Sequence, residues 1–335
     1  MYIVNNYTLA VILCTVTMIC WGSWSNTQKL AGKTWRQELY YWDYVIGVLL
    51  LSIFMAFTFG SIGDHGRGFI EDIQQVSWRN LLSAFTGGVI FNASCILLTA
   101  AIAIVGISVA FPVGVGIGTV FGVVINYIGQ PKGNPVILFL GVLLIMSAII
   151  FDGIAAGKMS GTKESGMSRK GLILSVLAGV LISFFYRFVA ASMDLNNFES
   201  PAPQMATPYT AFFIFAFGMF VSNFLFNTLI MKRPFVGTPT GYGEYFRGSF
   251  KTHMVGITGG LIWGLGTALS YLAAGKAGAA VSYGLSQGGT LVAALWGLLV
   301  WKEFKGASRS VNIMLSFMII LFIAGLAAII VAGNY

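Results

Sequence analysis

Ten apolar runs of about 20 residues, separated by short polar connections, restrict this chain to a membrane more than any other feature of its sequence. A run of this length crosses the hydrocarbon core once as a helix, because each backbone polar group must be bonded within the segment where water is absent. No connection is longer than about 20 residues, so there is no room for a soluble domain. The longest connection, 61–80, is polar and is predicted to hold a short interfacial helix. The predicted spans are residues 8–28, 39–60, 81–103, 107–128, 135–156, 171–193, 207–231, 253–274, 279–300 and 311–332.

Composition excludes two other classes of protein. Of the 335 residues, 57% are hydrophobic and 9% charged, whereas a soluble domain carries roughly 25% charged residues. The net charge of +8 does not indicate a nucleic-acid partner, because the basic residues lie in short loops and not on one solvated face. The three cysteines lie within apolar runs without metal-ligand spacing, so we predict packing roles, no structural disulfide and no metal site.

The Lys and Arg residues predict the orientation of the chain. One side carries 14 of them, in the loops after the first, fifth, seventh and ninth spans, and the other side carries 4, namely Arg67, Arg79, Lys132 and Lys276. Cytoplasmic loops hold the excess of Lys and Arg. We therefore expect an integral protein of the plasma (inner) membrane with both termini outside the cytoplasm.

Two segments of the sequence resemble each other at an offset of 172 residues. Thr86-Gly87-Gly88 matches Thr258-Gly259-Gly260, and the register is kept from Ile90 and Ile262 to Val109 and Val281. Five spans in each half, an odd number, place the halves in opposite orientations. The predicted fold is an all-α polytopic membrane protein with two inverted five-helix repeats, residues 1–158 and 171–335, joined by a cytoplasmic linker, 159–170. Repeats of this kind hold a solute near the midplane.

Several motifs resemble the glucose/ribose porter family of sugar permeases. Trp21-Gly22-Ser23 and residues 29–33, KLAGK, are similar to that family's pattern at the end of its first helix. Similar stretches in the second half are 260–266, 282–287 and Lys302-Glu303. The resemblance implies a transporter of a small sugar.

Other motifs resemble the ureide permease family. They are Tyr41-Trp-Asp-Tyr44, residues 56–60, residues 208–213 and residues 296–299. Both families belong to the drug/metabolite transporter superfamily, in which many small exporters carry a glutamate in the first helix. The first span here has no acidic residue, which argues against a cation-antiport exporter.

Charged side chains inside a span are the candidates for ion coupling, since a charge at a helix centre costs at least ~2.5 kcal/mol and persists mostly for function. Asp43 and Asp152 are predicted to couple transport to a proton or sodium gradient; the alternative is that both are solvated near the interface. Arg187 and Asp194, seven residues apart, are predicted to form a structural ion pair. No other cofactor is expected.

Neutral polar and aromatic side chains are the candidates for substrate binding, because sugars and ureides present hydroxyl, amide and carbonyl groups. We predict a site formed by Gln287, Tyr283, Asn92, Trp263, Trp21 and Trp24. The alternatives are an interfacial belt for Trp21 and Trp24 and a bond to a neighbouring helix for Gln287.

The glycine run at Gly114, Gly116, Gly118 and Gly122 is not a dinucleotide motif, since Thr119 stands at the third glycine position. Gly114, Gly118 and Gly122, spaced four residues apart, instead predict close helix packing, and Pro112 is expected to interrupt the same helix. No P-loop or hydrolase motif is present, so an enzyme is not expected.

The predicted function is secondary active import of a small neutral polar solute, a sugar in the first instance, by alternating access coupled to protons or sodium. A nucleobase or ureide permease is the alternative, followed by a drug or metabolite exporter, and then by a membrane sensor or enzyme. The expected partners are the small-molecule substrate and the lipid bilayer.

Overall fold

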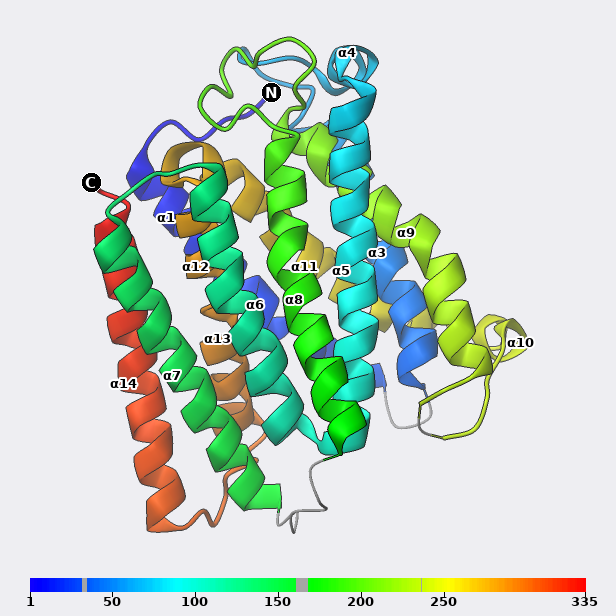
Figure 1. Cartoon of the computed structure of the whole chain (residues 1–335). Helices are drawn as coiled ribbons and strands as arrows, with labels where there is room; N and C mark the ends of the chain where they lie inside the picture. Colours follow the sequence, from blue (N-terminus) through cyan, green and yellow to red (C-terminus); the bar gives the residue numbers. More distant parts are fainter. Residues whose placement is uncertain (32–34, 161–167, 236) are drawn as a thin grey trace.

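The computed structural model describes residues 1–31, 35–160, 168–235 and 237–335. Ten helical segments in this part of the chain are long and apolar enough to cross a membrane, and they pack side by side as one bundle (Figure 1). Among the described residues, the only β pairing is an isolated bridge between Met193 and Ala206. The spans are α1 with α2 (Tyr7–Ser23 and Ser25–Ala31), α3 (Gln37–Phe57), α5 (Trp78–Val105), α6 (Ile107–Gly129), α7 (Pro135–Ser160), α8 (Arg169–Ala191), α9 (Pro208–Lys232), α11 (Phe250–Ala277), α12 with α13 and the π-helical turn η1 (Ala279–Ser286, Gly289–Leu295 and Trp296–Val300), and α14 (Arg309–Ala332).

The predicted all-helical membrane fold with ten spans is confirmed, and the helix ends lie within a few residues of the predicted ones. The connection 61–80 contains the expected short helix, α4 (Phe69–Gln75). A second short helix, α10 (Tyr242–Phe246), was not predicted. Gly32 and Lys33 of the KLAGK motif, and residues 161–167 of the predicted linker, lie outside the described residues.

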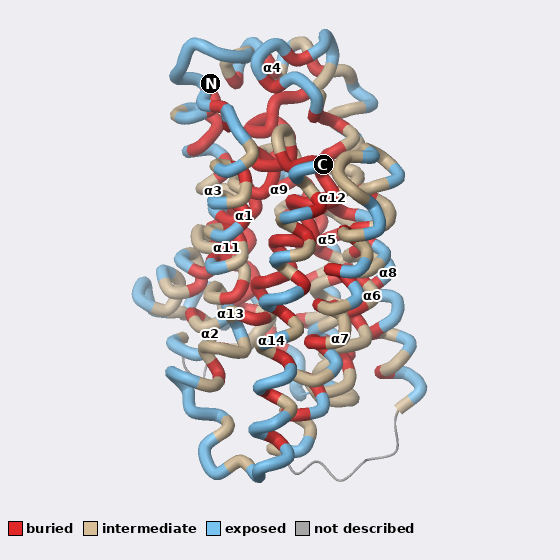
Figure 2. The backbone as a smooth tube through the Cα atoms, turned by 90° about the vertical axis from the view of Figure 1, so that its left-hand side faces the viewer, coloured by how far each residue is buried: buried red, intermediate tan, exposed pale blue. Residues whose placement is uncertain are grey.

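The outer faces of the helices are exposed, as Figure 2 shows, and many of the exposed side chains are large and apolar. On α14, the side chains of Ile313, Phe317, Ile320 and Ile323 are all exposed. A continuous apolar face of this kind is unusual on a soluble monomer. It is the surface that a lipid bilayer covers.

α5 in the first half and α11 in the second half have the same length and the same kinds of helix ends. α5 and α11 each have 28 residues, each begins after a serine N-cap (Ser77 and Ser249), and each ends at a glycine, Gly106 or Gly278. Both glycines have a positive φ, 80° and 85°, which favours a residue without a Cβ. All of these positions differ by 172 residues, the offset of the sequence match.

The close contacts of α5 and α11 also correspond. A Cβ on Gly88 of α5 would lie 2.1 Å from the carbonyl oxygen of Phe215 on α9, and a Cβ on Gly260 of α11 would lie 2.0 Å from that of Tyr44 on α3. The two helices begin at opposite ends of the bundle, α5 next to α4 and α11 next to α10 (Figure 1). These matches favour the inverted repeat, which stays a prediction.

Gly114, Gly118 and Gly122 of α6 pack closely on neighbouring helices, as predicted, whereas a Cβ on Gly116 would meet nothing within 4 Å. A Cβ on Gly118 would collide with Ile182 of α8, and one on Gly122 would collide with the ring of Tyr283. The expected interruption at Pro112 was wrong, because α6 continues through this residue. The ninth span is interrupted instead, at Gln287 and Gly288 between α12 and α13.

At the end of the bundle where both termini lie, the loops are held together by hydrogen bonds (Figure 1). Asp72 of α4 is fully buried, and its carboxylate accepts hydrogen bonds from Arg67 Nε at 2.9 Å and from the backbone N–H of Thr207 at 2.8 Å. Thr207 in turn caps α9. This clamp joins the α3–α5 connection to the start of α9.

Candidate functional site

A cavity of about 630 Å³ opens between α1, α2, α3, α5, α6, α7 and α13. Its wall includes Glu303 and Phe304, which follow η1, so the cavity reaches the end of the bundle opposite the termini. The volume lies in the range of small-molecule sites. The residues that line it are Trp24, Ser25, Gln28, Gln37, Tyr41, Tyr44, Phe91, Cys95, Leu98, Thr99, Ile102, Ala103, Phe111, Pro112, Asp152, Gly153, Ala156, Thr290, Ala293, Ala294, Gly297, Glu303 and Phe304.

Two glutamine amides form the most polar part of the wall. Gln28 at the end of the first span donates from Nε2 to Oε1 of Gln37, the first residue of α3. Among the described residues, none donates to the Gln28 side-chain carbonyl and none accepts from the Gln37 amino group. These two groups therefore present one acceptor and one donor to a solute.

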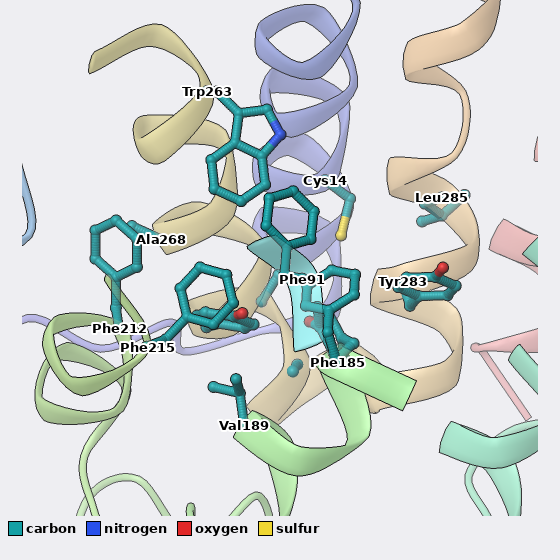
Figure 3. Packing of buried hydrophobic residues seen from close by; sticks show 14 of the residues in the cluster. Cys14, Phe91, Phe185, Val189, Phe212, Phe215, Trp263, Ala268, Tyr283 and Leu285 are labelled. Carbon is teal, nitrogen blue, oxygen red and sulfur yellow. The ribbon is translucent and has the colours of Figure 1, made fainter. Parts of the chain in front are cut away.

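Aromatic rings form the deep wall of the cavity. Trp24 packs against Tyr44, with ring centroids 4.8 Å apart, and both rings line the cavity. Phe91 of α5 lines it too and stacks on Trp263 of α11 at 4.6 Å and 26° (Figure 3). Flat apolar faces next to amides suit a polar ring with two faces.

Trp263 and Trp21 stand behind this wall. Trp263 is 4% exposed and packs on Phe91 and Tyr44, both in the wall. Trp21 stacks on Trp263 with an interplanar angle of 7°, and its Nε1 donates to Thr267 at 3.1 Å. Of the three predicted tryptophans, only Trp24 thus lines the cavity.

Two carboxylates line the cavity, Asp152 of α7 and Glu303. Glu303 forms an ion pair with Lys29 at 2.5 Å. No described residue donates a hydrogen bond to Asp152, and Lys158, the cation six residues further along the chain, donates to Ser310 Oγ at 3.2 Å. Asp152 is thus a carboxylate in the cavity wall without a countercharge among the described residues.

Gln287 and Tyr283 lie at the interruption of the ninth span, next to α6. Oε1 of Gln287 accepts from Thr119 Oγ1 at 3.2 Å, and the Tyr283 hydroxyl donates to the carbonyl of Gly118 at 2.9 Å. Tyr283 is fully buried among aromatic rings (Figure 3). Neither residue lines the cavity. Thr290 does line it, and its hydroxyl donates to the main-chain carbonyl of Gln287 at 2.8 Å.

Asn92 lies in the contact between α5 and α9, away from the cavity. Its Nδ2 donates to Ser222 Oγ at 2.8 Å and to the carbonyl of Met219 at 3.2 Å. The residue is fully buried. The geometry is that of a bond between helices.

Asp43 points away from the cavity into a buried cluster near α10. Its carboxylate accepts from Tyr245 at 2.7 Å and from Trp35 Nε1 at 3.2 Å, and it lies 2.8 Å from His253 Nδ1. Burial, together with the nearby carboxylate, raises the pKa of Tyr245, so its hydroxyl stays a donor.

The predicted Arg187–Asp194 pair is replaced by a different contact. α8 ends at Ala191, so the two residues do not share a helix face, and they are not within ion-pair distance. The Asp194 carboxylate instead accepts from the backbone N–H groups of Asn196 and Ala202, at 3.3 and 3.0 Å. Asp194 therefore orders the loop before α9.

The site residues that sequence reasoning missed are Gln37, Tyr41, Tyr44 and Glu303. Tyr41 and Tyr44 are three residues apart and share a helix face. That spacing was the available signal, whereas the ion-coupling prediction singled out their neighbour Asp43, which lies on another face of α3. Within the described parts of the chain, no group of three His, Cys, Asp or Glu side chains could hold a metal ion.

The bundle and its cavity define a polytopic membrane transporter, and sequence comparison identifies the family. The ureide permease family model matches residues 40–169 and 162–332. The chain belongs to the ureide permease family.

The relatives are permeases and uptake proteins, not enzymes. Ureide permease 1 of Arabidopsis thaliana is 24% identical over the full length of both chains. The glucose uptake protein GlcU of Bacillus subtilis is 22% identical over 93% of this chain and 95% of its own. A crystal structure of a protein with 13% identity has the same fold, with a TM-score of 0.67 over 97% of this chain and 96% of that one. The predicted resemblance to both families and the predicted transporter class are therefore confirmed.

Proposed function

We propose that the protein carries a small, neutral, amide-containing ring, a ureide or a nucleobase, across the plasma membrane by alternating access. The observation that carries this proposal is the cavity wall, which combines the Gln28 and Gln37 amides with the rings of Trp24, Tyr44 and Phe91. An amide wall matches the alternating N–H and C=O groups of such a ring. Membership of the ureide permease family supports this cargo over the sugar expected first.

A sugar is the second candidate. The GlcU relatives favour it, and amides and hydroxyls also bind sugar hydroxyl groups. A drug or metabolite exporter has less support, because the relatives are named as permeases and uptake proteins.

Asp152 is our candidate for the coupling site. It lies in the cavity wall without a countercharge, so a proton or a sodium ion arriving with the solute would neutralise it. Asp43, the other residue predicted for this role, lies away from the cavity, and three side chains already bond its carboxylate. Coupling through Asp152 supports import along an inward ion gradient.

The test is counterflow in proteoliposomes loaded with allantoin, uracil or glucose. Allantoin or uracil should exchange with its labelled form, and glucose should not. Ala294→Leu adds bulk to the cavity wall and should abolish exchange, whereas Ala324→Leu on the lipid-facing side of α14 should not. Exchange of glucose alone would establish a sugar transporter. Exchange of none of the three solutes would overturn both the ureide or nucleobase proposal and the sugar alternative.

A further inference from the structure

A second chamber of about 210 Å³ lies beside the cavity, between α3, α5 and α9. The two spaces share the side chains of Gln37, Tyr41, Cys95, Thr99 and Ala103 as a common border. The chamber alone is lined by Glu38, Ile96, Ala100, Asn227, Ile230 and Phe235. Its volume is sufficient for a substituent of a few heavy atoms, since one water occupies about 30 Å³ in the liquid.

The chamber favours a neutral group. Its one carboxylate, Glu38, forms an ion pair with Arg36 at 3.0 Å and is only partly exposed. The remaining lining consists of amides, hydroxyls and apolar side chains. A charged substituent would therefore lose its hydration without a countercharge.

Three polar groups at the chamber are free to bond a ligand. The Tyr41 hydroxyl is buried, and its only hydrogen-bonding neighbour among the described residues is the Cys95 thiol, a weak partner. The amide of Asn227 donates to the carbonyl of Glu38 at 2.8 Å, but no described residue donates to its Oδ1. The amino group of Gln37 also has no acceptor in the part of the chain that the structure describes. Burying such groups unpaired is costly, so a polar occupant that bonds them is favoured over an apolar occupant such as a lipid acyl chain.

We propose that this chamber is a second subsite, which receives the urea- or amide-type substituent of an extended solute while its ring lies in the central cavity. A urea group offers N–H donors to Asn227 Oδ1 and a carbonyl acceptor to the Tyr41 hydroxyl and the Gln37 amino group. The subsite determines specificity, because it adds bonds only for solutes that carry such a substituent. The inference rests on the proposed function and names the part of the solute that each space holds.

Allantoin and hydantoin form a matched pair for the test, since hydantoin is the ring of allantoin without the urea substituent. Ala100→Leu fills the chamber from a position that does not line the cavity. It should weaken allantoin binding about 10-fold or more and change hydantoin binding less than about twofold. Tyr41→Phe, which removes only the free hydroxyl, should also weaken allantoin more than hydantoin. The matched control Ala294→Leu in the central cavity should weaken both solutes together.

Cys95 supplies a second measurement that does not depend on transport. It borders both spaces and is partly exposed, whereas Cys14 and Cys20 are buried. Allantoin should slow the reaction of Cys95 with N-ethylmaleimide more than hydantoin does at equal site occupancy, and Cys95→Ala should remove the signal.

The failures are distinguishable. If the unaltered protein binds neither allantoin, uracil nor hydantoin, the proposed function fails. If it binds allantoin and hydantoin but Ala100→Leu and Tyr41→Phe weaken both equally, or Cys95 is protected equally by both, the proposed function stands and the second subsite is refuted.

Discussion

His253 Nδ1 lies 2.8 Å from Asp43 Oδ1, and this pair joins α11 to α3 next to the short helix α10. Tyr245 and Trp35 donate to the same carboxylate, so one buried aspartate connects four segments of the chain. The cluster lies on the face of α3 opposite to Tyr41 and Tyr44, which line the cavity. Its geometry is that of a structural junction.

Replacing Asp43 should therefore affect stability more than coupling. Asp43→Ala leaves the donors of Trp35, Tyr245 and His253 without an acceptor; since only Trp35 among them is buried, the free energy of unfolding should fall by about 1–3 kcal/mol in total. Thermal unfolding of the purified variant measures this change, while solute affinity and accumulation should be retained. A variant of normal stability that exchanges solute but no longer accumulates it would return Asp43 to the coupling role.

Replacing Asp152 should produce the opposite phenotype. Asp152→Asn removes the charge and keeps the size of a side chain that no described residue bonds, so stability should change little. Concentrative uptake driven by an ion gradient should disappear, whereas counterflow, which needs no gradient, should persist. Glu303→Gln serves as the control, because Glu303 is already paired with Lys29. Accumulation by Asp152→Asn at the normal level would remove Asp152 from the mechanism.

The ten spans were predictable because hydropathy reports a local property, the need of each segment to bond its own backbone in lipid. The cavity was not, because it depends on which helix faces meet. Asp43 and Tyr44 are neighbours in sequence, yet one faces the α10 cluster and the other the cavity.

The pairing of charges failed for a related reason. Arg187 and Asp194 have the spacing of one helix face, but α8 ends before Asp194 and the loop supplies backbone donors to its carboxylate. The end of a helix is decided by tertiary contacts that the sequence of a single chain does not display.

The orientation of the chain can be tested directly. The 14-to-4 imbalance of Lys and Arg predicts that both termini face away from the cytoplasm. A C-terminal reporter that is active only in the cytoplasm should be silent, and the same reporter inserted in the loop 300–308 should be active. The reverse pattern would refute the orientation and place the cavity opening outside.

The equivalent glycines of the two halves should be equally intolerant of a side chain. Gly88→Ala and Gly260→Ala each place a Cβ about 2 Å from a backbone oxygen of the facing helix. Overpacking of this kind typically costs 1–3 kcal/mol. Gly116→Ala is the matched control on α6, since a Cβ there meets nothing within 4 Å. Thermal unfolding should show a loss of stability in Gly88→Ala and Gly260→Ala but not in Gly116→Ala. Normal stability of Gly260→Ala would contradict equivalent packing in the two halves.

Gln287 can act on the solute or brace the interrupted span, and two variants separate these roles. Its Oε1 accepts from Thr119, so Thr119→Val removes the same bond from the other side. If Gln287 only braces α13 against α6, Gln287→Ala and Thr119→Val should lower stability similarly and leave affinity unchanged. We expect Gln287→Ala to lower solute affinity as well as stability. The side-chain amino group of Gln287 has no acceptor among the described residues, and Gln287 lies one turn from Thr290 in the cavity wall. Loss of a solute contact of 1–3 kcal/mol raises the dissociation constant about 5- to 150-fold. Measuring thermal stability and solute affinity on both purified variants decides between the roles, and equal affinities in the two would assign Gln287 to packing alone.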